Sequence, residues 1–228
     1  MLDPHWACYH TQLYTFEHDR IQFGIIGCVV GAPFAVLVAE ELFACGCQFL
    51  ISVTSAGLIL PNRTPPFFVL IERALRDEGT SYHYLLPSAY VHLDTRVLTT
   101  LRGAFAALRI PVYGGATWTT DAPFRETPRA IEYARSQGIV AVEMEAAGLY
   151  ALARARQRPI VCFAHVTNRM GNVVGDFEKG DERGSRDALQ VIAAAARAWA
   201  ARSQVGVTPL RRRGVGVRRR ERHDGIDA

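Results

Sequence analysis

Apolar runs and helical patterns alternate along the chain from its first third onward. The run Ile21–Val30 (IQFGIIGCVV) predicts a first buried strand, after which Gly31 and Pro33 turn the chain into a helix. Apolar residues recur at helical spacing there, at Phe34, Leu37, Val38 and Leu42. Gln48–Val53 predicts a second buried strand, which we expect to end in the small-residue turn Thr54–Gly57.

The same alternation continues toward the end of the chain. We expect strands at Phe67–Ile71, Pro111–Thr117, Ile139–Val142 and Pro159–Val166. We expect helices after the cap Asp94 (apolar stripe to Leu108), from Thr127-Pro128 to Gln137, from about Glu145 to Arg156, and from Ser185 to Arg202. Strands that alternate with helices favour an α/β fold with a largely parallel sheet.

Length and charge indicate one domain followed by a basic tail. A chain of 228 residues with 49% hydrophobic content can bury one substantial core, which we assign to residues 1–202. Residues 203–228 hold seven arginines and three acids, which accounts for the whole formal net charge of +4. The neutral body does not indicate a nucleic-acid-binding face. We expect the tail to be disordered and solvated, with contact to RNA or acidic lipid as the alternative.

Composition excludes several other classes of protein. No apolar run reaches the length of a membrane span, and the N-terminus MLDPHWACYH lacks the order of a secretory signal. The five cysteines show no CxxC pairing, and Cys45 and Cys47 have no matching second ligand pair for zinc. We therefore expect a cytoplasmic protein with reduced cysteines and no metal.

Candidate chemistry lies where predicted strands end. In open α/β sheets, ligands bind beyond the carboxyl ends of strands. Four polar groups of residues occupy such positions: Thr54-Ser55, Thr119–Arg125, Glu143–Glu145 and Thr167–Arg169. We expect them to converge.

Glu143-Met144-Glu145 is the most informative of the four groups. Its two carboxylates flank a methionine directly after the apolar run Val140–Val142. A carboxylate can accept hydrogen bonds from both hydroxyls of a ribose diol, while a thioether packs on the sugar's apolar face. The alternative is that both glutamates only stabilise a helix N-terminus through its dipole.

Two further groups suit an anion and a base. Thr54–Gly57 offers hydroxyls and closely spaced amides for an oxyanion such as phosphate. Thr117–Arg125 joins aromatic and hydrogen-bonding groups, as a nucleobase pocket requires. Each pattern alone also fits an ordinary turn or a structural loop.

At these residues the sequence resembles the nucleoside phosphorylase family, which includes uridine and purine nucleoside phosphorylases. The resemblance runs from about Ile25 to Trp199, with its parts in the family's order: VVGAPFAVLVAEEL, SVTSAG, TWTTDAPFRET, VEMEAAGLYA and HVTNRMG. It implies a three-layer αβα sandwich with a central mixed, largely parallel sheet. It also implies a homo-oligomer, either a dimer or a hexamer.

The resemblance implies a role for each matching residue. Thr54 and Ser55, with the backbone near Gly31, would bind phosphate. Glu145 would bind the 2′ and 3′ hydroxyls of ribose together with Met144, and Glu143 would lie beside them. Phe124 and Arg125 would lie near the base. The substrates would be a nucleoside and inorganic phosphate, with no cofactor.

Asn168 and Arg169 bear on the choice of base. Purine-specific relatives and hydrolytic nucleosidases resemble Ser-Asp where this chain has Thr167-Asn168, and their Asp protonates the purine. An amide cannot act as a general acid near neutral pH. The pair Asn168-Arg169 resembles the uridine phosphorylase pattern instead, so we expect both residues at the catalytic centre and a pyrimidine as the base.

Ile51 is the main departure from the family, which usually has an arginine three residues before the phosphate-binding Thr. Because that phosphate contact is missing, three alternatives stay open. The protein could be a hydrolytic nucleosidase, a purine nucleoside phosphorylase, or a catalytically impaired protein that binds nucleosides.

Overall fold

The computed structural model describes residues 1–8, 10–168 and 184–205. Its strands are β1 (Tyr14–His18), β2 (Ile21–Ile25), β3 (Leu50–Leu58), β4 (Phe67–Asp77), β5 (Tyr90–His92), β6 (Val112–Thr120), β7 (Ile139–Glu143) and β8 (Ile160–Asn168). Its helices are α1 (Ala32–Ala44), α2 (Thr95–Leu101), α3 (Pro128–Ser136), α4 (Ala146–Arg156) and α5 (Ser185–Val205). Two short 3-10 turns are η1 (Thr80–His83) and η2 (Pro123–Arg125). The proposed tail beyond residue 205 lies outside the described residues.

A mixed sheet in the order β5-β4-β6-β7-β3-β8 forms the centre of the molecule. The two longest pairings, β4–β6 and β3–β8, are parallel, whereas β3 runs antiparallel to β7. Strand β8 also pairs with β4, so the sheet curls until β4, β6, β7, β3 and β8 close into a ring. The α/β class with a mixed, largely parallel sheet is confirmed.

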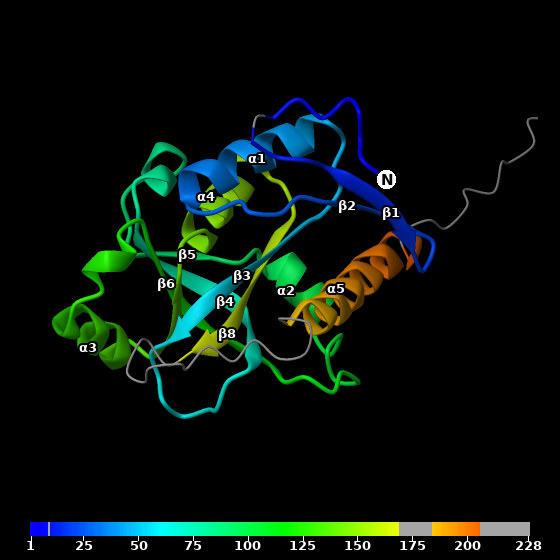
Figure 1. Ribbon diagram of the computed structural model, residues 1–228. Coiled ribbons are helices and arrows are strands. Elements are labelled where there is room, and N and C mark those ends of the chain that lie inside the picture. Colours follow the sequence, from blue (N-terminus) through cyan, green and yellow to red (C-terminus); the bar gives the residue numbers. More distant parts are fainter. Residues whose placement is uncertain (9, 169–183, 206–228) are drawn as a thin grey trace, which may run out of the picture.

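Helices cover this sheet on two sides (Figure 1). Helices α1 and α4 pack against each other on one side, and α2 packs against α5 on another. Tyr150 ties α4 to the sheet, because its buried hydroxyl donates to the carbonyl of Ile71 (2.6 Å) and accepts from the amide of Cys162 (3.0 Å). No helix of the described ranges is long and apolar enough to cross a membrane.

A glycine lets α1 and α4 approach closely near their N-termini. A Cβ atom added to Gly148 would lie 2.9 Å from the Cβ of Ala32 and 3.2 Å from a methyl of Val36. Real side-chain atoms do not approach that closely, so this contact requires glycine. It brings together Gly31 and Glu145, the residues that directly precede the two helices.

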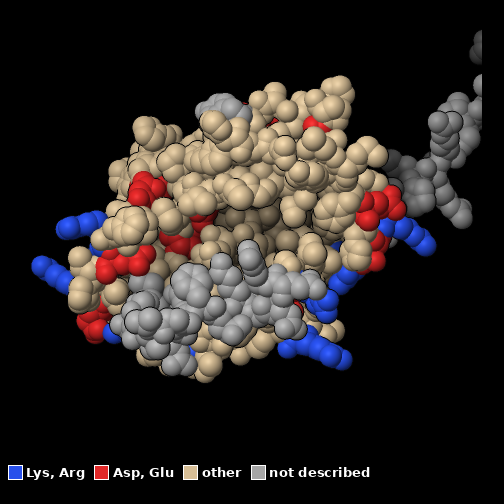
Figure 2. All heavy atoms as spheres, in the orientation of Figure 1, with Lys and Arg blue, Asp and Glu red and all other residues tan. Residues whose placement is uncertain are grey.

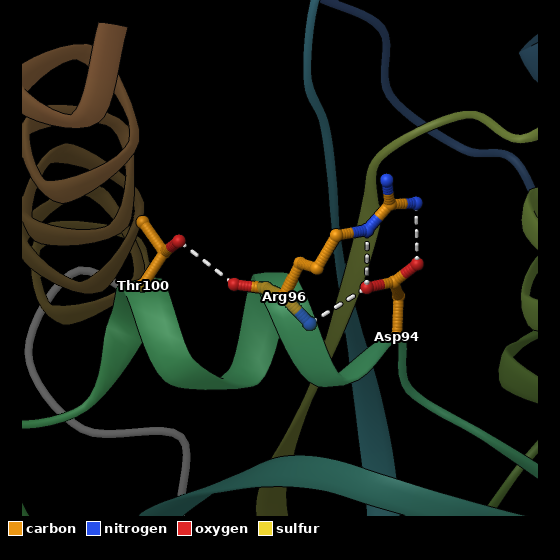
Figure 3. A network of polar contacts seen from close by, with 3 residues as sticks. All are labelled: Asp94, Arg96 and Thr100. Carbon is orange, nitrogen blue, oxygen red and sulfur yellow. Dashed lines mark hydrogen bonds and ion pairs between the residues drawn. The ribbon is translucent and has the colours of Figure 1, made fainter. Parts of the chain in front are cut away.

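The predicted helix caps at Asp94 and Thr127 are confirmed. Figure 3 shows the Asp94 carboxylate accepting from the backbone amide of Arg96 (2.7 Å) and from its guanidinium, a hydrogen bond that lowers the pKa of Asp94. The side chain of Thr127 accepts from the amide of Ala130. The first of these helices is shorter than predicted: α2 ends at Leu101, before Gly103 takes a φ of 79°.

The prediction that Ile21–Val30 is a buried strand is wrong. Strand β2 ends at Ile25 and is partly exposed, and it pairs only with β1, an antiparallel partner that the sequence did not reveal. A two-stranded ribbon can bury one side at most. Phe23 stacks on Phe16 of β1 (5.2 Å between ring centroids), while Ile25 stays 43% exposed.

The predicted turn at Thr54–Gly57 is also wrong, because these residues lie within β3. Thr54 pairs with Ala164 and Ser55 with His165 of β8, and beyond them Gly57 and Leu58 pair with β7. Tertiary pairing on both sides overrides the turn preference of the small residues. Other strands are likewise longer than predicted, since β4 extends to Asp77 and β6 to Thr120.

Candidate active site

Strand register places Thr54 beside the end of β7. Strand β3 runs antiparallel to β7, with Gly57 opposite Val142 and Leu58 opposite Ala141. Continuing this register past the end of β7 brings Thr54 level with Glu145. Thr54 therefore reaches the site from the middle of a strand, not from a strand's carboxyl end as the sequence predicted.

Glu145 joins three segments of the chain at one carboxylate. It is 4% exposed. Its Oε1 accepts from the backbone amide of Gly31 (2.7 Å), and its Oε2 accepts from the hydroxyl of Thr54 (2.7 Å) and the amide of Met144 (3.3 Å). Of the four polar groups expected to converge, Thr54 and Glu145 meet directly here. We call Gly31, Thr54 and Glu145 the Glu145 site.

Glu143 lies beneath this site and supports it. Its side chain is buried and accepts from the hydroxyls of Thr117 and Thr119 and from the amides of Glu145 (2.8 Å) and Ala146 (2.7 Å). Burial raises its pKa to about 7, although the hydrogen bonds from Thr119 and the two amides act in the opposite direction. Glu143 thus anchors the turn from β7 into α4 through hydrogen bonds within the chain.

Thr117 and Thr119 were not recognised as a pair from the sequence. They stand two residues apart on β6, so both side chains point to the same face, where Glu143 ends the neighbouring β7. The hydroxyl of Thr119 also accepts from the amide of Ala147 (3.0 Å). The available signal was the spacing of Thr117 and Thr119 across the end of the predicted strand Pro111–Thr117.

Met144 is the residue of this turn that reaches the surface. It is partly exposed, whereas Glu143 and Glu145 on either side are buried. Ser55, next to Thr54, is exposed and lies on the opposite face of β3, because successive side chains of a strand alternate. The structure therefore does not bring Ser55 into the Glu145 site.

Asn168 lies farther along β3, at the end of β8. It pairs with Gly57, after a bulge at Thr167 that places an extra residue on β8. Gly57 is three residues from Thr54, or about 10 Å along a strand. The side chain of Asn168 and the whole of Arg169 lie outside the described residues. Thr167 itself is 1% exposed, and its hydroxyl has no hydrogen-bond partner among the described residues.

Among the described residues, no hydrogen bond or ion pair joins Phe124 or Arg125 to the Glu145 site. Both residues belong to η2, which follows β6, and Phe124 is 100% exposed. The aromatic residue of this region that is buried is Trp118, whose indole N–H donates to Asp77 (2.8 Å). Within the described part of the chain, both predicted base-binding residues are exposed.

Ile51 supplies an apolar side chain to β3 and packs against the hydrophobic core.

An apolar hollow lies away from the Glu145 site, between the β1–β2 ribbon and α5, and is lined by Phe16, Phe23 and Ile192 among others. None of its lining residues belongs to the Glu145 site. Figure 2 shows acidic and basic side chains dispersed at the margins of one face, with no continuous patch of one sign among the described residues.

Comparison with known proteins identifies relatives of this arrangement. A family model described as Phosphorylase superfamily matches residues 5–198. Guanosine phosphorylase of Halorubrum lacusprofundi is 26% identical over 164 residues, 72% of this chain and 67% of that protein. Uridine phosphorylase of Thermococcus kodakarensis is 26% identical over 195 residues, 79% of this chain and 70% of that protein.

Solved structures share the fold at lower identity. A uridine phosphorylase from Vibrio fischeri superposes with a TM-score of 0.70 at 20% identity, covering 90% of this chain and 82% of that one. An AMP nucleosidase from Bacteroides thetaiotaomicron gives a TM-score of 0.67 at 19% identity, covering 85% and 77% respectively. These likenesses establish the fold.

Proposed function

The chain belongs to the phosphorylase superfamily, and we propose that it is a nucleoside phosphorylase that cleaves the N-glycosidic bond with inorganic phosphate. The observation that carries the proposal is the Glu145 site. One buried carboxylate lies within a hydrogen bond of both a helix-capping amide and a strand hydroxyl. To hold ribose next to phosphate, a site needs a carboxylate that binds the diol and, beside it, donors that bind an oxyanion.

In the proposed reaction, the bond between C1′ and the base nitrogen breaks and a bond from C1′ to a phosphate oxygen forms. The electron pair of the broken bond leaves with the base, which takes up a proton, and the products are free base and (deoxy)ribose 1-phosphate. The transition state resembles an oxocarbenium ion. The enzyme must therefore hold the sugar rigidly and place the phosphate on one face of it.

We assign the sugar and phosphate to the buried end of the site. Glu145 accepts from the 2′ and 3′ hydroxyls, and Met144 packs on the sugar. Glu143 lies beside them and keeps the turn in place. Thr54 and the Gly31 amide bind phosphate, and Ser55, on the opposite face of β3, is left out of that subsite.

We assign the leaving base to the end of β8 and the η2 turn. Asn168 and Arg169 act at the catalytic centre, where Arg169 with Arg125 stabilises negative charge on the departing base, and Phe124 stacks on it. The distance of about 10 Å from Thr54 to Gly57, the partner of Asn168, suits a nucleoside that lies along β3. A uridine-like pyrimidine is favoured because an amide cannot protonate a purine.

The rest of the proposal concerns the protein's setting. We propose that it works in the cytoplasm as a homo-oligomer, with phosphate as co-substrate and without a metal or organic cofactor. We propose no membrane partner, and nucleic-acid contact only through residues 203–228.

A second candidate function is hydrolysis, in which water replaces phosphate. The observation that favours it is Ile51, an apolar residue where the family resemblance places a phosphate-binding arginine. A purine substrate is the other alternative, supported by the similarity to a guanosine phosphorylase.

The test is a screen of common ribonucleosides and deoxyribonucleosides, with base release measured in the presence and absence of inorganic phosphate. The proposal expects release that depends on phosphate and yields a pentose 1-phosphate. Equal release without phosphate would establish the nucleosidase instead. Ligand-induced thermal stabilisation with no release under either condition would indicate a binding protein.

A further inference from the structure

The two groups proposed to bind phosphate are both engaged by Glu145. The amide of Gly31 donates to its Oε1, and the hydroxyl of Thr54 donates to its Oε2, each at 2.7 Å. A backbone amide and a hydroxyl each carry a single proton to donate. Neither group can therefore make a full hydrogen bond to phosphate while it keeps its present bond to the carboxylate.

Two residues near these donors offer phosphate no substitute for them. Pro33, in the first turn of α1, lacks an N–H. Ile51, three residues before Thr54 on β3, carries no charge. A phosphate that arrived alone would also face the nearby negative charge of the buried Glu145, which repels it.

The backbone of Glu145 is held independently of its side chain. Its amide donates to Glu143, and its carbonyl accepts from Leu149 in the first turn of α4. The carboxylate can therefore change partners by rotation of its side chain alone. The hydroxyls of a ribose are the partners that the proposed function provides.

We infer that the Glu145 carboxylate occupies the phosphate donors until a nucleoside draws it to the ribose hydroxyls, so that nucleoside binding admits phosphate. This inference rests on the proposed function and adds the order in which the two substrates bind. Nucleoside binds first, and phosphate follows. By thermodynamic linkage, each substrate then strengthens the binding of the other by the same factor.

Calorimetric titration with inorganic phosphate alone tests the inference without regard to base preference. Glu145→Ala removes the competing carboxylate, so this variant should bind phosphate at least tenfold more tightly than the unmodified protein. Adding Thr54→Val should reduce that gain, because the freed hydroxyl is then absent and the Gly31 amide alone remains. The surface variant Glu132→Ala also removes one negative charge, from a side chain that is 74% exposed, and should leave phosphate affinity unchanged.

A more conservative variant and a kinetic measurement on the unmodified protein provide independent tests. Glu145→Gln keeps the shape of the side chain but loses the charge, and it should bind phosphate more tightly than the unmodified protein. In the unmodified protein, the Michaelis constant for phosphate at saturating nucleoside should be at least tenfold below the dissociation constant for phosphate alone. Folding of each variant is checked by circular dichroism.

The outcomes separate this inference from the proposed function. If base release requires phosphate but folded Glu145→Ala and Glu145→Gln bind phosphate no more tightly than the unmodified protein, the inferred order is overturned and the proposed function stands. If base release is the same with and without phosphate, the proposed function is overturned, regardless of the results of the titrations.

Discussion

The sugar end and the base end of the candidate site differ in how the protein holds them. At the sugar end, Glu143 and Glu145 are buried, and their carboxylates accept hydrogen bonds from strands and helix termini, that of Glu143 also from the backbone amide of Glu145. At the base end, Phe124 is fully exposed on a short turn. Under the proposed assignment, the part of the site that every nucleoside would share is built into the core. The part that would distinguish bases is left to a surface segment.

The largest effect should come from removing the carboxylate at the sugar end. Glu145→Ala should lower kcat/KM on the order of ten- to a hundredfold, because hydrogen bonds to a charged group contribute about 1.5–3 kcal/mol. Steady-state kinetics with the best nucleoside of the screen measures this. Unchanged kinetics in a folded variant would refute the ribose role.

Gly148→Ala should damage the same end through packing. The new methyl would meet Ala32 and Val36, so α1 and α4 must separate, with a loss of about 1–3 kcal/mol in the free energy of unfolding. Urea denaturation measures the loss. Gly27→Ala is the matched control, since a Cβ there meets nothing within 4 Å, and equal stability of the two variants would contradict the close contact.

Glu143 should make stability depend on pH. Its pKa is raised from 4.5 to about 7 in the folded protein, so between those values the folded state holds a proton that the unfolded state releases. This residue's contribution to stability is therefore present below pH 4.5 and is lost as the pH rises to about 7. In Glu143→Gln the loss should disappear.

Urea denaturation of both proteins across pH 4.5–7 measures the effect of Glu143. The difference in unfolding free energy should shift by up to about 3 kcal/mol in favour of the variant as pH rises. Parallel pH profiles would show that the carboxyl titrates normally.

The smallest effect belongs to the base end. Phe124→Ala should leave the free energy of unfolding within about 0.5 kcal/mol, because an exposed side chain has no packing to lose. The KM for nucleoside should rise several-fold while kcat changes little. A loss of stability, or an unaltered KM, would remove Phe124 from the proposed base subsite.

The sequence predicted what local signals determine. The caps at Asp94 and Thr127 and the helix after Glu145 depend on neighbouring residues, and the structure contains all three. The meeting of Thr54 with Glu145 was predicted from the positions of both at the ends of predicted strands. Its physical cause is the antiparallel register between β3 and β7, which cannot be predicted from the sequence of either strand alone.

The errors arose where tertiary pairing decided the outcome. The small residues of Thr54–Gly57 read as a turn, yet β8 and β7 extend β3 through them. The apolar run Ile21–Val30 read as a core strand, yet its partner is a neighbouring short strand outside the sheet. The support of Glu143 by Thr117 and Thr119 likewise required knowing that β6 and β7 are adjacent.

A crystal structure of the protein with bound ribose 1-phosphate would show whether Glu145 exchanges its partners. We expect the 2′ and 3′ hydroxyls to donate to Glu145, and the phosphate to accept from Thr54 and Gly31 in its place. A bound sugar phosphate elsewhere, with Glu145 still bonded to Gly31 and Thr54, would contradict this expectation.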